Sequence, residues 1–268
     1  MEKYSFNEKE HIHTLDGVPL VGTTTALSVI TKPLTWWASG LACTEFGWSN
    51  PRTTSADVCF EKAREMLDKI KSMSTLSYQQ LLNRAYRAHS VKLTKSADAG
   101  IDRHTLIENY INSDIEKKPM LIIDDSIKPF VEWSKKNVRR FLFSELHCYS
   151  RPLWVGGIAD FGYEDMNGNY VLCDLKSSRE AYFSQWVQLA GYQMQIEENG
   201  GYAANGEKIF KADRPFVSNA IFCFGYDLGK PFFNHEGLRC KRAFSYAVNL
   251  YKERMLFEKE FKLINRMA

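Results

Sequence analysis

Two aspartates and one lysine in the second half of the chain have the types and spacing for metal-assisted hydrolysis. Asp174 and Lys176 are two residues apart in NYVLCDLKSS (169–178), and Asp160 precedes them in LWVGGIADFGYE (153–164). Two carboxylates that share a pocket repel each other unless a cation lies between them, and oxygen-rich pockets suit Mg²⁺ or Mn²⁺. Such a cation can orient a phosphodiester and acidify water, while a neighbouring lysine offsets the negative charge that develops on the phosphate.

The elements around these residues are predicted to bring them together. Both segments are typical of β-strands, and Asn167-Gly168 between them is a turn signal for a β-hairpin. Alternate residues of a strand share a face, so Asp174 and Lys176 are expected to point the same way while Leu175 packs on the other face. The first aspartate can then approach the second across the hairpin. The alternative is a solvated hairpin with only a salt bridge between the second aspartate and the lysine.

The coarse order of elements predicts a mixed α/β sheet with helices on its faces. Apolar residues at helical spacing predict helices, and alternating or apolar runs predict strands. The predicted helices cover residues 55–73, 77–94, 97–115, 124–139, 181–198 and 237–263, and the predicted strands cover residues 141–150, 153–164, 169–178, 215–227 and 231–235.

The first predicted strand of the sheet carries an acidic residue among aromatic ones. Its alternation predicts one shared face for Phe141, Phe143, Glu145, His147 and Tyr149. Glu145 is therefore either half-buried at a site or solvated at the end of the strand.

The composition is that of an ordinary globular protein. The chain has 268 residues, 44% hydrophobic and 25% charged, with a formal net charge of +3. So slight a charge neither requires nor excludes a nucleic-acid partner. The six cysteines are scattered without a CxxC pair or a secretory signal, so we expect free thiols and no iron–sulfur cluster. No apolar run approaches the roughly 18 residues of a membrane span. We therefore expect a soluble, cytoplasmic protein with no membrane partner.

Two short pairs of residues lie outside these patterns. His11 and His13 form an H-x-H pair that we interpret as incidental. Trp36 and Trp37 are candidates for stacking on unpaired bases, but we favour packing within the N-terminal lobe as their role.

Several motifs, in one order along the chain, resemble the PD-(D/E)XK nuclease superfamily and its RecB-like exonuclease branch in particular. GGIADFGYEDMNGNYVLCDLKSS (156–178) resembles the G-x-x-D…hhDhK-[ST]-[ST] core of that branch, and QLAGY (188–192) resembles its Q-x-x-x-Y helix. Upstream, GIDRHTLIE (100–108) resembles its G-x-x-x-H-x-x-x-E helix, and Glu145 matches an acidic residue on the strand before the first aspartate. GTTTALSVITKPLTWWASG (22–40) is similar to a segment of phage and mitochondrial genome-maintenance exonucleases of this branch.

The resemblance implies a metal centre and a catalytic lysine. His104, Asp160 and Asp174 would be metal ligands, joined by the carbonyl of Leu175, and Lys176 would be the catalytic lysine. The core motif carries an aspartate at its second acidic position, where the family also accepts glutamate. The alanine before the first aspartate replaces the proline of the superfamily name, which is common in this branch.

Further roles follow for the residues around this centre. Glu145 would lie at the metal or one water molecule away from it, Gln188 would orient the lysine or the scissile phosphate, and Tyr192 would support that network or touch the DNA backbone. Gln185 competes for the role of Gln188. The plain alternative for the histidine is a half-buried side chain bonded to Glu108, four residues further along its helix.

Taken together, these motifs predict that the protein is a metal-dependent deoxyribonuclease. We expect a restriction-endonuclease-like mixed central sheet flanked by helices, with a helical N-terminal lobe over 1–95 and a nuclease core over 96–268. The expected activity is Mg²⁺- or Mn²⁺-dependent hydrolysis of DNA, by an exonuclease on single-stranded or end-bearing DNA in recombination, repair or replication. The alternatives are a structure- or sequence-specific endonuclease and a non-catalytic DNA-binding protein that retains the fold. A helicase or annealing protein as a further partner, a phage origin, the polarity and the oligomeric state stay open.

Overall fold

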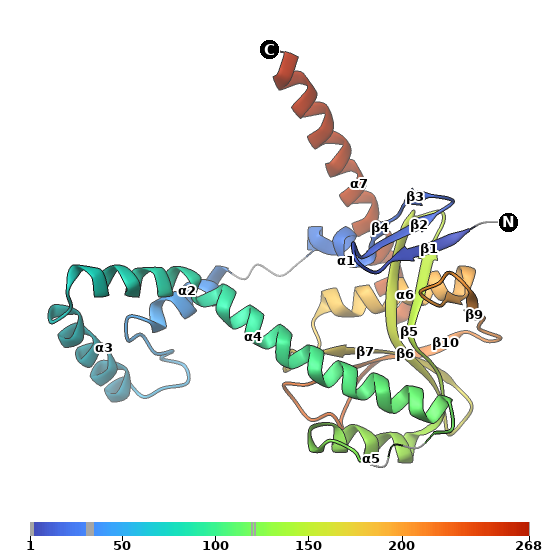
Figure 1. The fold of residues 1–268 in the computed structure, drawn as a ribbon, viewed down its shortest axis with the longest axis horizontal. Coiled ribbons are helices and arrows are strands. Elements are labelled where there is room, and N and C mark those ends of the chain that lie inside the picture. Colours follow the sequence, from blue (N-terminus) through green and yellow to red (C-terminus); the bar gives the residue numbers. More distant parts are fainter. Residues whose placement is uncertain (1–2, 31–34, 119, 121, 268) are drawn as a thin grey trace. The chain divides into compact units, whose positions relative to one another are not determined.

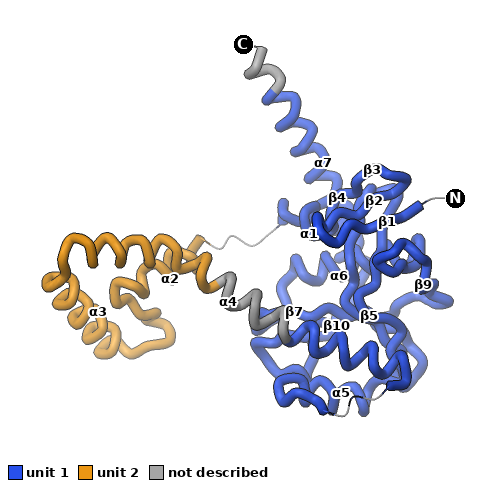
Figure 2. The backbone as a smooth tube through the Cα atoms, in the orientation of Figure 1, with its two compact units in different colours: residues 1–31, 100–268 blue, residues 32–99 orange. Residues whose placement is uncertain are grey.

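The structure is a computed structural model in which the chain divides into two compact units (Figure 2). Unit 1 comprises residues 1–31 and 100–268, and unit 2 comprises residues 32–99. The lobe that we predicted over 1–95 differs from unit 2, because the first part of the chain pairs with the central sheet of unit 1. The described residues are 3–30, 35–118, 120 and 122–267, with their side chains except those of 93–102 and 263–267.

A mixed sheet runs through unit 1 (Figure 1). Within the described residues it has eight strands in the order β11-β10-β7-β6-β5-β8-β9, with β4 beside one end of β6. β7 pairs in parallel with β10 and antiparallel with β6, so the prediction of a mixed sheet is confirmed. The strands are β4 (Val21–Gly22), β5 (Val138–Ser150), β6 (Val155–Asp165), β7 (Tyr170–Lys176), β8 (Gly201–Tyr202), β9 (Lys208–Phe210), β10 (Phe216–Cys223) and β11 (Phe232–Asn234).

Helices flank this sheet on both faces. On one face, Ile107 and Phe130 from two helices pack against strand residues such as Phe161 and Phe222 in what we call the α4/α5 core. On the other face, α6 covers the sheet, and α7 packs against α6 (Figure 1). Burial of each large apolar side chain stabilises such a core by about 1.5–3 kcal/mol. The helices are α4 (Thr75–Ile115), α5 (Lys128–Asn137), α6 (Phe183–Asn199) and α7 (Gly237–Met267).

The hairpin predicted around Asn167-Gly168 is formed by β6 and β7. Gly168 has a φ of 84°, a left-handed value that glycine adopts without strain. The Asp165 carboxylate accepts hydrogen bonds from the backbone N–H groups of Asn167 and Asn169, both at 2.8 Å. These bonds close the turn and fix the register of the two strands.

β5 departs from the simple alternation that we expected. Phe141 packs in the α4/α5 core, but Phe143 packs on the α6 side of the sheet, so the prediction of one shared face is wrong for Phe143. The pairing with β6 shifts by one residue between these two phenylalanines, and such a bulge turns the side chains that follow it to the other face. Glu145, further along the same strand, has a φ of 48°.

The first part of unit 1 consists of short elements that the sequence pattern did not predict. A small antiparallel sheet packs on β5 through Tyr4, Leu15 and Tyr149, and β4 then joins the central sheet beside β6. The elements are β1 (Tyr4–Asn7), β2 (Ile12–Leu15), β3 (Val18–Pro19), the helix α1 (Thr23–Ala26) and the 3₁₀ helix η1 (Leu27–Ile30).

Unit 2 is helical. It contains α2 (Thr35–Thr44), α3 (Ala56–Lys71) and the N-terminal part of α4. The two helices predicted on either side of residue 95 are one helix in the structure, and the segment between them contains no proline that would break it. Trp36 is 90% exposed and Trp37 is 38% exposed, so the packing that we favoured for this pair is wrong for Trp36. None of the described helices is both long and apolar enough to cross a membrane.

Two buried histidines hold the small N-terminal sheet against β5. The hydroxyl of Tyr4 forms hydrogen bonds with Nδ1 of His13 at 2.6 Å and with Nδ1 of His147 at 3.3 Å. Burial, reinforced by the neighbouring histidines, lowers the pKa of His13 to about 3 and that of His147 to about 4. His13, which we interpreted as incidental, therefore has a packing role that requires the neutral imidazole.

These histidines predict an acid-labile fold. Each is neutral in the folded protein but binds a proton after unfolding once the pH falls below its ordinary pKa of 6.5. The free energy of unfolding should therefore fall by up to about 1.4 kcal/mol per pH unit for each histidine as the pH drops from 6.5 towards 4. Urea unfolding at several pH values measures this slope. His147→Gln should flatten it, whereas the control His235→Gln, at an exposed histidine, should not. An unchanged slope in His147→Gln would contradict the assignment.

Candidate functional site

Asp160, Asp174 and Lys176 converge at one end of the β6–β7 hairpin. Asp160 directly precedes Phe161 on β6 and Asp174 directly follows Cys173 on β7, and these two neighbours pair with each other, so the antiparallel strands place the aspartates opposite each other. The backbone N–H of Leu175 donates a hydrogen bond to Oδ2 of Asp160 at 2.6 Å. Nζ of Lys176 lies 2.6 Å from Oδ2 of Asp174. The side chain of Leu175 packs in the α4/α5 core on the other face, as predicted.

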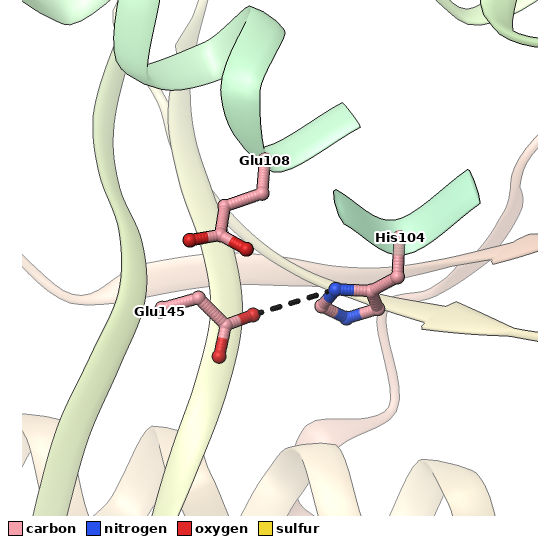
Figure 3. Close-up of side chains that lie close together, drawn as sticks. All are labelled: His104, Glu108 and Glu145. Carbon is pink, nitrogen blue, oxygen red and sulfur yellow. Dashed lines mark ion pairs between the residues drawn. The ribbon is translucent and has the colours of Figure 1, made fainter. Parts of the chain in front are cut away.

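α4 and β5 add a histidine and a glutamate to this group. Nε2 of His104 lies 3.2 Å from Oδ2 of Asp160, and its Nδ1 lies 3.6 Å from Oε1 of Glu145. Figure 3 shows His104 and Glu108 reaching from α4 towards Glu145 on β5. Ligand atoms of His104, Glu108 and Glu145 all lie within 4.8 Å of one another. The histidine thus contacts two acidic groups from the sheet. A bond to Glu108 alone, the alternative that we considered, does not account for these contacts.

Two carboxyl groups and the histidine of the site have raised pKa values. Burial, reinforced by the charge of Asp160, raises the pKa of Glu145 to about 8. Burial also raises the pKa of Asp174 to about 7, although the adjacent Lys176 opposes the shift. Burial works against protonation of His104, but its hydrogen bond to Asp160 and the surrounding carboxylates outweigh burial and raise its pKa to about 9.

Asp160 and Lys176 keep their charges. Burial disfavours the charged form of Asp160, but its contacts with His104 and the charge of Lys176 lower its pKa below the ordinary value. Burial likewise opposes the charge of Lys176, whose pKa is nevertheless raised by Asp174 and Asp160. Protons on His104 and the lysine thus provide the positive charge of the site when no other cation is bound.

Three buried carboxylate oxygens of the site have no hydrogen-bond partner among the described residues. They are Oε1 of Glu145 and both oxygens of Asp174, of which Oδ2 has only its ion pair with Lys176. Leaving a charged oxygen buried without a partner costs about 1–3 kcal/mol or more. Native structures retain such groups where a ligand or ion satisfies them. The oxygens, together with one imidazole, therefore fit a hard divalent cation with an oxygen-rich shell.

Gln188 and Tyr192 form the pair that their spacing predicted. Nε2 of Gln188 donates a hydrogen bond to the hydroxyl of Tyr192 at 2.8 Å, one turn along α6. Burial and the nearby charge of Asp174 raise the pKa of Tyr192 well above its ordinary value, so the phenol stays neutral. Gln185 instead accepts a hydrogen bond from the backbone N–H of Tyr182 at the start of α6. That capping bond leaves Gln188 as the glutamine paired with the tyrosine.

A cavity of about 380 Å³ opens onto the site. His104, Glu145, Asp160 and Tyr192 line one part of it. The rest is lined by N-terminal residues that we did not assign to the site and by the strand start before Asp160, namely His11, Ile12, His13, Leu20, Gly22, Thr23, Thr24, Thr25, Gly156, Gly157 and Ile158. The segment 22–40 carried the only signal for this wall, and its residues 31–34 lie outside the described residues.

Glycine at position 157 lets the N-terminal wall approach the sheet. A Cβ atom there would come within 2.5 Å of the ring of Tyr192 and 2.9 Å of Oγ1 of Thr23. The Thr23 hydroxyl donates a hydrogen bond to the carbonyl of Gly156 at 3.1 Å and accepts one from Gln195 at 2.9 Å. The two glycines of the core motif thus allow three chain segments to meet beside the acidic cluster.

Neither the protein-family models nor the curated protein sequences contain a match to this chain. We therefore interpret the site from its geometry.

Metal binding at this site should release protons. A cation needs neutral His104 and ionised carboxylates, but the pKa values of His104, Glu145 and Asp174 are raised to about 9, 8 and 7. Affinity for Mn²⁺ should therefore rise as the pH rises from 7 to 9. Calorimetric titration in two buffers of different ionisation enthalpy measures the affinity for Mn²⁺ and the number of protons released. Asp174→Asn should bind at least about tenfold more weakly, whereas Glu116→Gln, at an exposed residue, should bind normally. Binding that is independent of pH would contradict the site.

Proposed function

We propose that this protein is a divalent-cation-dependent deoxyribonuclease. The observation that supports this most is the group of buried carboxylate oxygens of Asp174 and Glu145 that no hydrogen bond satisfies among the described residues, which lies beside Lys176 and near His104 and Asp160. A structural salt bridge alone would not leave such oxygens unsatisfied. The motifs that resemble the RecB-like exonuclease branch supply the rest of the proposal, namely DNA as the substrate and attack from a strand end.

The residues divide the work between holding a cation and stabilising the phosphate. His104, Asp160, Asp174 and Glu145 would hold Mg²⁺ or Mn²⁺, which when bound would acidify water and stabilise negative charge on the phosphate. The Leu175 carbonyl joins this set through the resemblance alone. Asp160 is oriented for the task by the N–H of Leu175 at 2.6 Å.

Lys176 is the positive group that would face the reacting phosphate. Its ammonium lies against Asp174 at 2.6 Å and its side chain is 21% exposed, so it is fixed in place yet open to a ligand. A fixed positive charge stabilises the transition state more than the substrate, because negative charge increases on the phosphate during attack. Gln188 would help to orient the lysine or the phosphate, and Tyr192 forms the neutral wall beside them.

Removal of the lysine charge should slow cleavage strongly without abolishing metal binding. Lys176→Ala should lower the rate of Mn²⁺-dependent DNA cleavage by about 10²–10³-fold, the usual cost of one stabilising group. Gel analysis of end-labelled DNA measures the rate, and thermal unfolding verifies the fold. Lys176→Gln, which keeps most of the side-chain length, serves if the alanine variant unfolds.

The matched control is Lys118→Ala, since Lys118 is a lysine of unit 1 whose side chain is 79% exposed. This variant should cleave at the wild-type rate. Folded Lys176 variants that also cleave at that rate would refute the catalytic assignment.

The form of the DNA distinguishes the proposed exonuclease from an endonuclease. An exonuclease should degrade linear single-stranded or duplex DNA to short products and leave a closed circle of the same sequence intact, because the circle offers no end. The measurement is a time course with both substrates in Mg²⁺ and in Mn²⁺. Cleavage of the circle at a comparable rate would favour the endonuclease. Binding without any cleavage, in either metal, would favour a non-catalytic DNA-binding protein.

A further inference from the structure

The C-terminal helix α7 has two halves with different surroundings. Its first half packs on the body of unit 1, where Phe244 and Val248 are fully buried against α6 and η1. Its second half extends away from that body (Figure 1). An isolated helical segment of this length is marginally stable in water unless an apolar face is covered. We therefore expect the second half to be stabilised by packing against another surface.

An exposed apolar stripe runs along both halves of α7. Tyr246, Leu250 and Phe257 are 71%, 57% and 65% exposed. At about 100° of rotation per residue, these three positions lie within roughly 40° of one another on the helix surface. The exposed Glu253 lies on the same side of the helix between Leu250 and Phe257, so one charged residue interrupts the stripe. Scattered exposed apolar residues are ordinary, but large ones that gather on one side of a helix mark a contact surface.

The charges beside the stripe are arranged to match a second copy of the same helix. Arg242 and Glu260 are both exposed and lie five helical turns apart, on the same flank of the stripe. Antiparallel helices bring equal flanks together, so the arginine of one copy would lie opposite the glutamate of the other, twice in the pair. The midpoint of these two positions is residue 251, and the midpoint of Tyr246 and Phe257 falls beside it.

We propose that α7 pairs with α7 of a second copy of this chain, antiparallel, about a two-fold axis near residue 251. Tyr246 of each copy packs against Phe257 of the other, and Arg242 of each copy pairs with Glu260 of the other. The free second half of each helix then lies along the anchored first half of its partner. Both halves of the stripe are covered by one symmetric contact, independently of the proposed nuclease activity.

Molar mass in solution tests the pairing directly. Light scattering on the eluted full-length protein, over a wide range of concentrations, should give twice the 30.9 kDa of one chain. Phe257→Asp should give the mass of one chain while its circular dichroism and thermal unfolding show that unit 1 is folded. Met255→Asp is the matched control, because Met255 lies about 160° around the helix from Phe257 and should leave the dimer intact. A monomeric wild-type protein, or a dimer that survives Phe257→Asp, would overturn the proposal.

Charge reversal tests the antiparallel arrangement. Arg242→Glu and Glu260→Arg should each weaken self-association by about tenfold, because each places like charges opposite each other at two symmetric contacts. An equal mixture of the two variants should recover wild-type dimerisation, since every contact in the mixed pair joins opposite charges. A mixture as weak as its components would exclude the antiparallel pairing.

Discussion

The need to balance buried negative charge governs this molecule more than any other constraint. Asp174 is 1% exposed, and Lys176, its only ion-pair partner within the described part of the chain, belongs to the same strand. Removal of one member of such a buried pair costs about 3–5 kcal/mol, because an uncompensated charge is left behind. Yet one lysine cannot satisfy two aspartates and a glutamate. The remaining negative charge is balanced by protons on His104 and the carboxyl groups, or by a cation that replaces these protons.

Hydrogen bonds and core packing position the elements around this charge. The turn closed by Asp165 sets the register of β6 against β7, and the core under Leu175 fixes the face on which the charged side chains lie. α4 then brings its histidine over the end of the hairpin. The left-handed backbone of Glu145 is a conformation that costs about 1–3 kcal/mol for residues other than glycine. The packing of β5 between its neighbours holds this strained residue towards the histidine.

The sequence predicted those parts of the site that are set by the backbone geometry of a single turn, strand or helix. The hairpin turn, the two-residue alternation of β7 and the one-turn spacing of Gln188 and Tyr192 each follow from backbone geometry alone. The bulge that separates Phe141 from Phe143 does not, because an inserted residue changes the face without changing the composition of the strand. The N-terminal wall was missed for a different reason. Its strands are two to four residues long, too short for any periodicity to appear.

The hydrogen bond from Thr23 to Gly156 joins residues that are 133 positions apart. The cavity wall therefore has no docking place while only the first part of the chain has left the ribosome, and the segment that forms β4 must wait for β6. Contacts of such long range slow folding, because the intervening chain has to be ordered or closed into a loop first. The cavity can therefore close only after the chain has been synthesised through α6, which contributes Tyr192 to its lining.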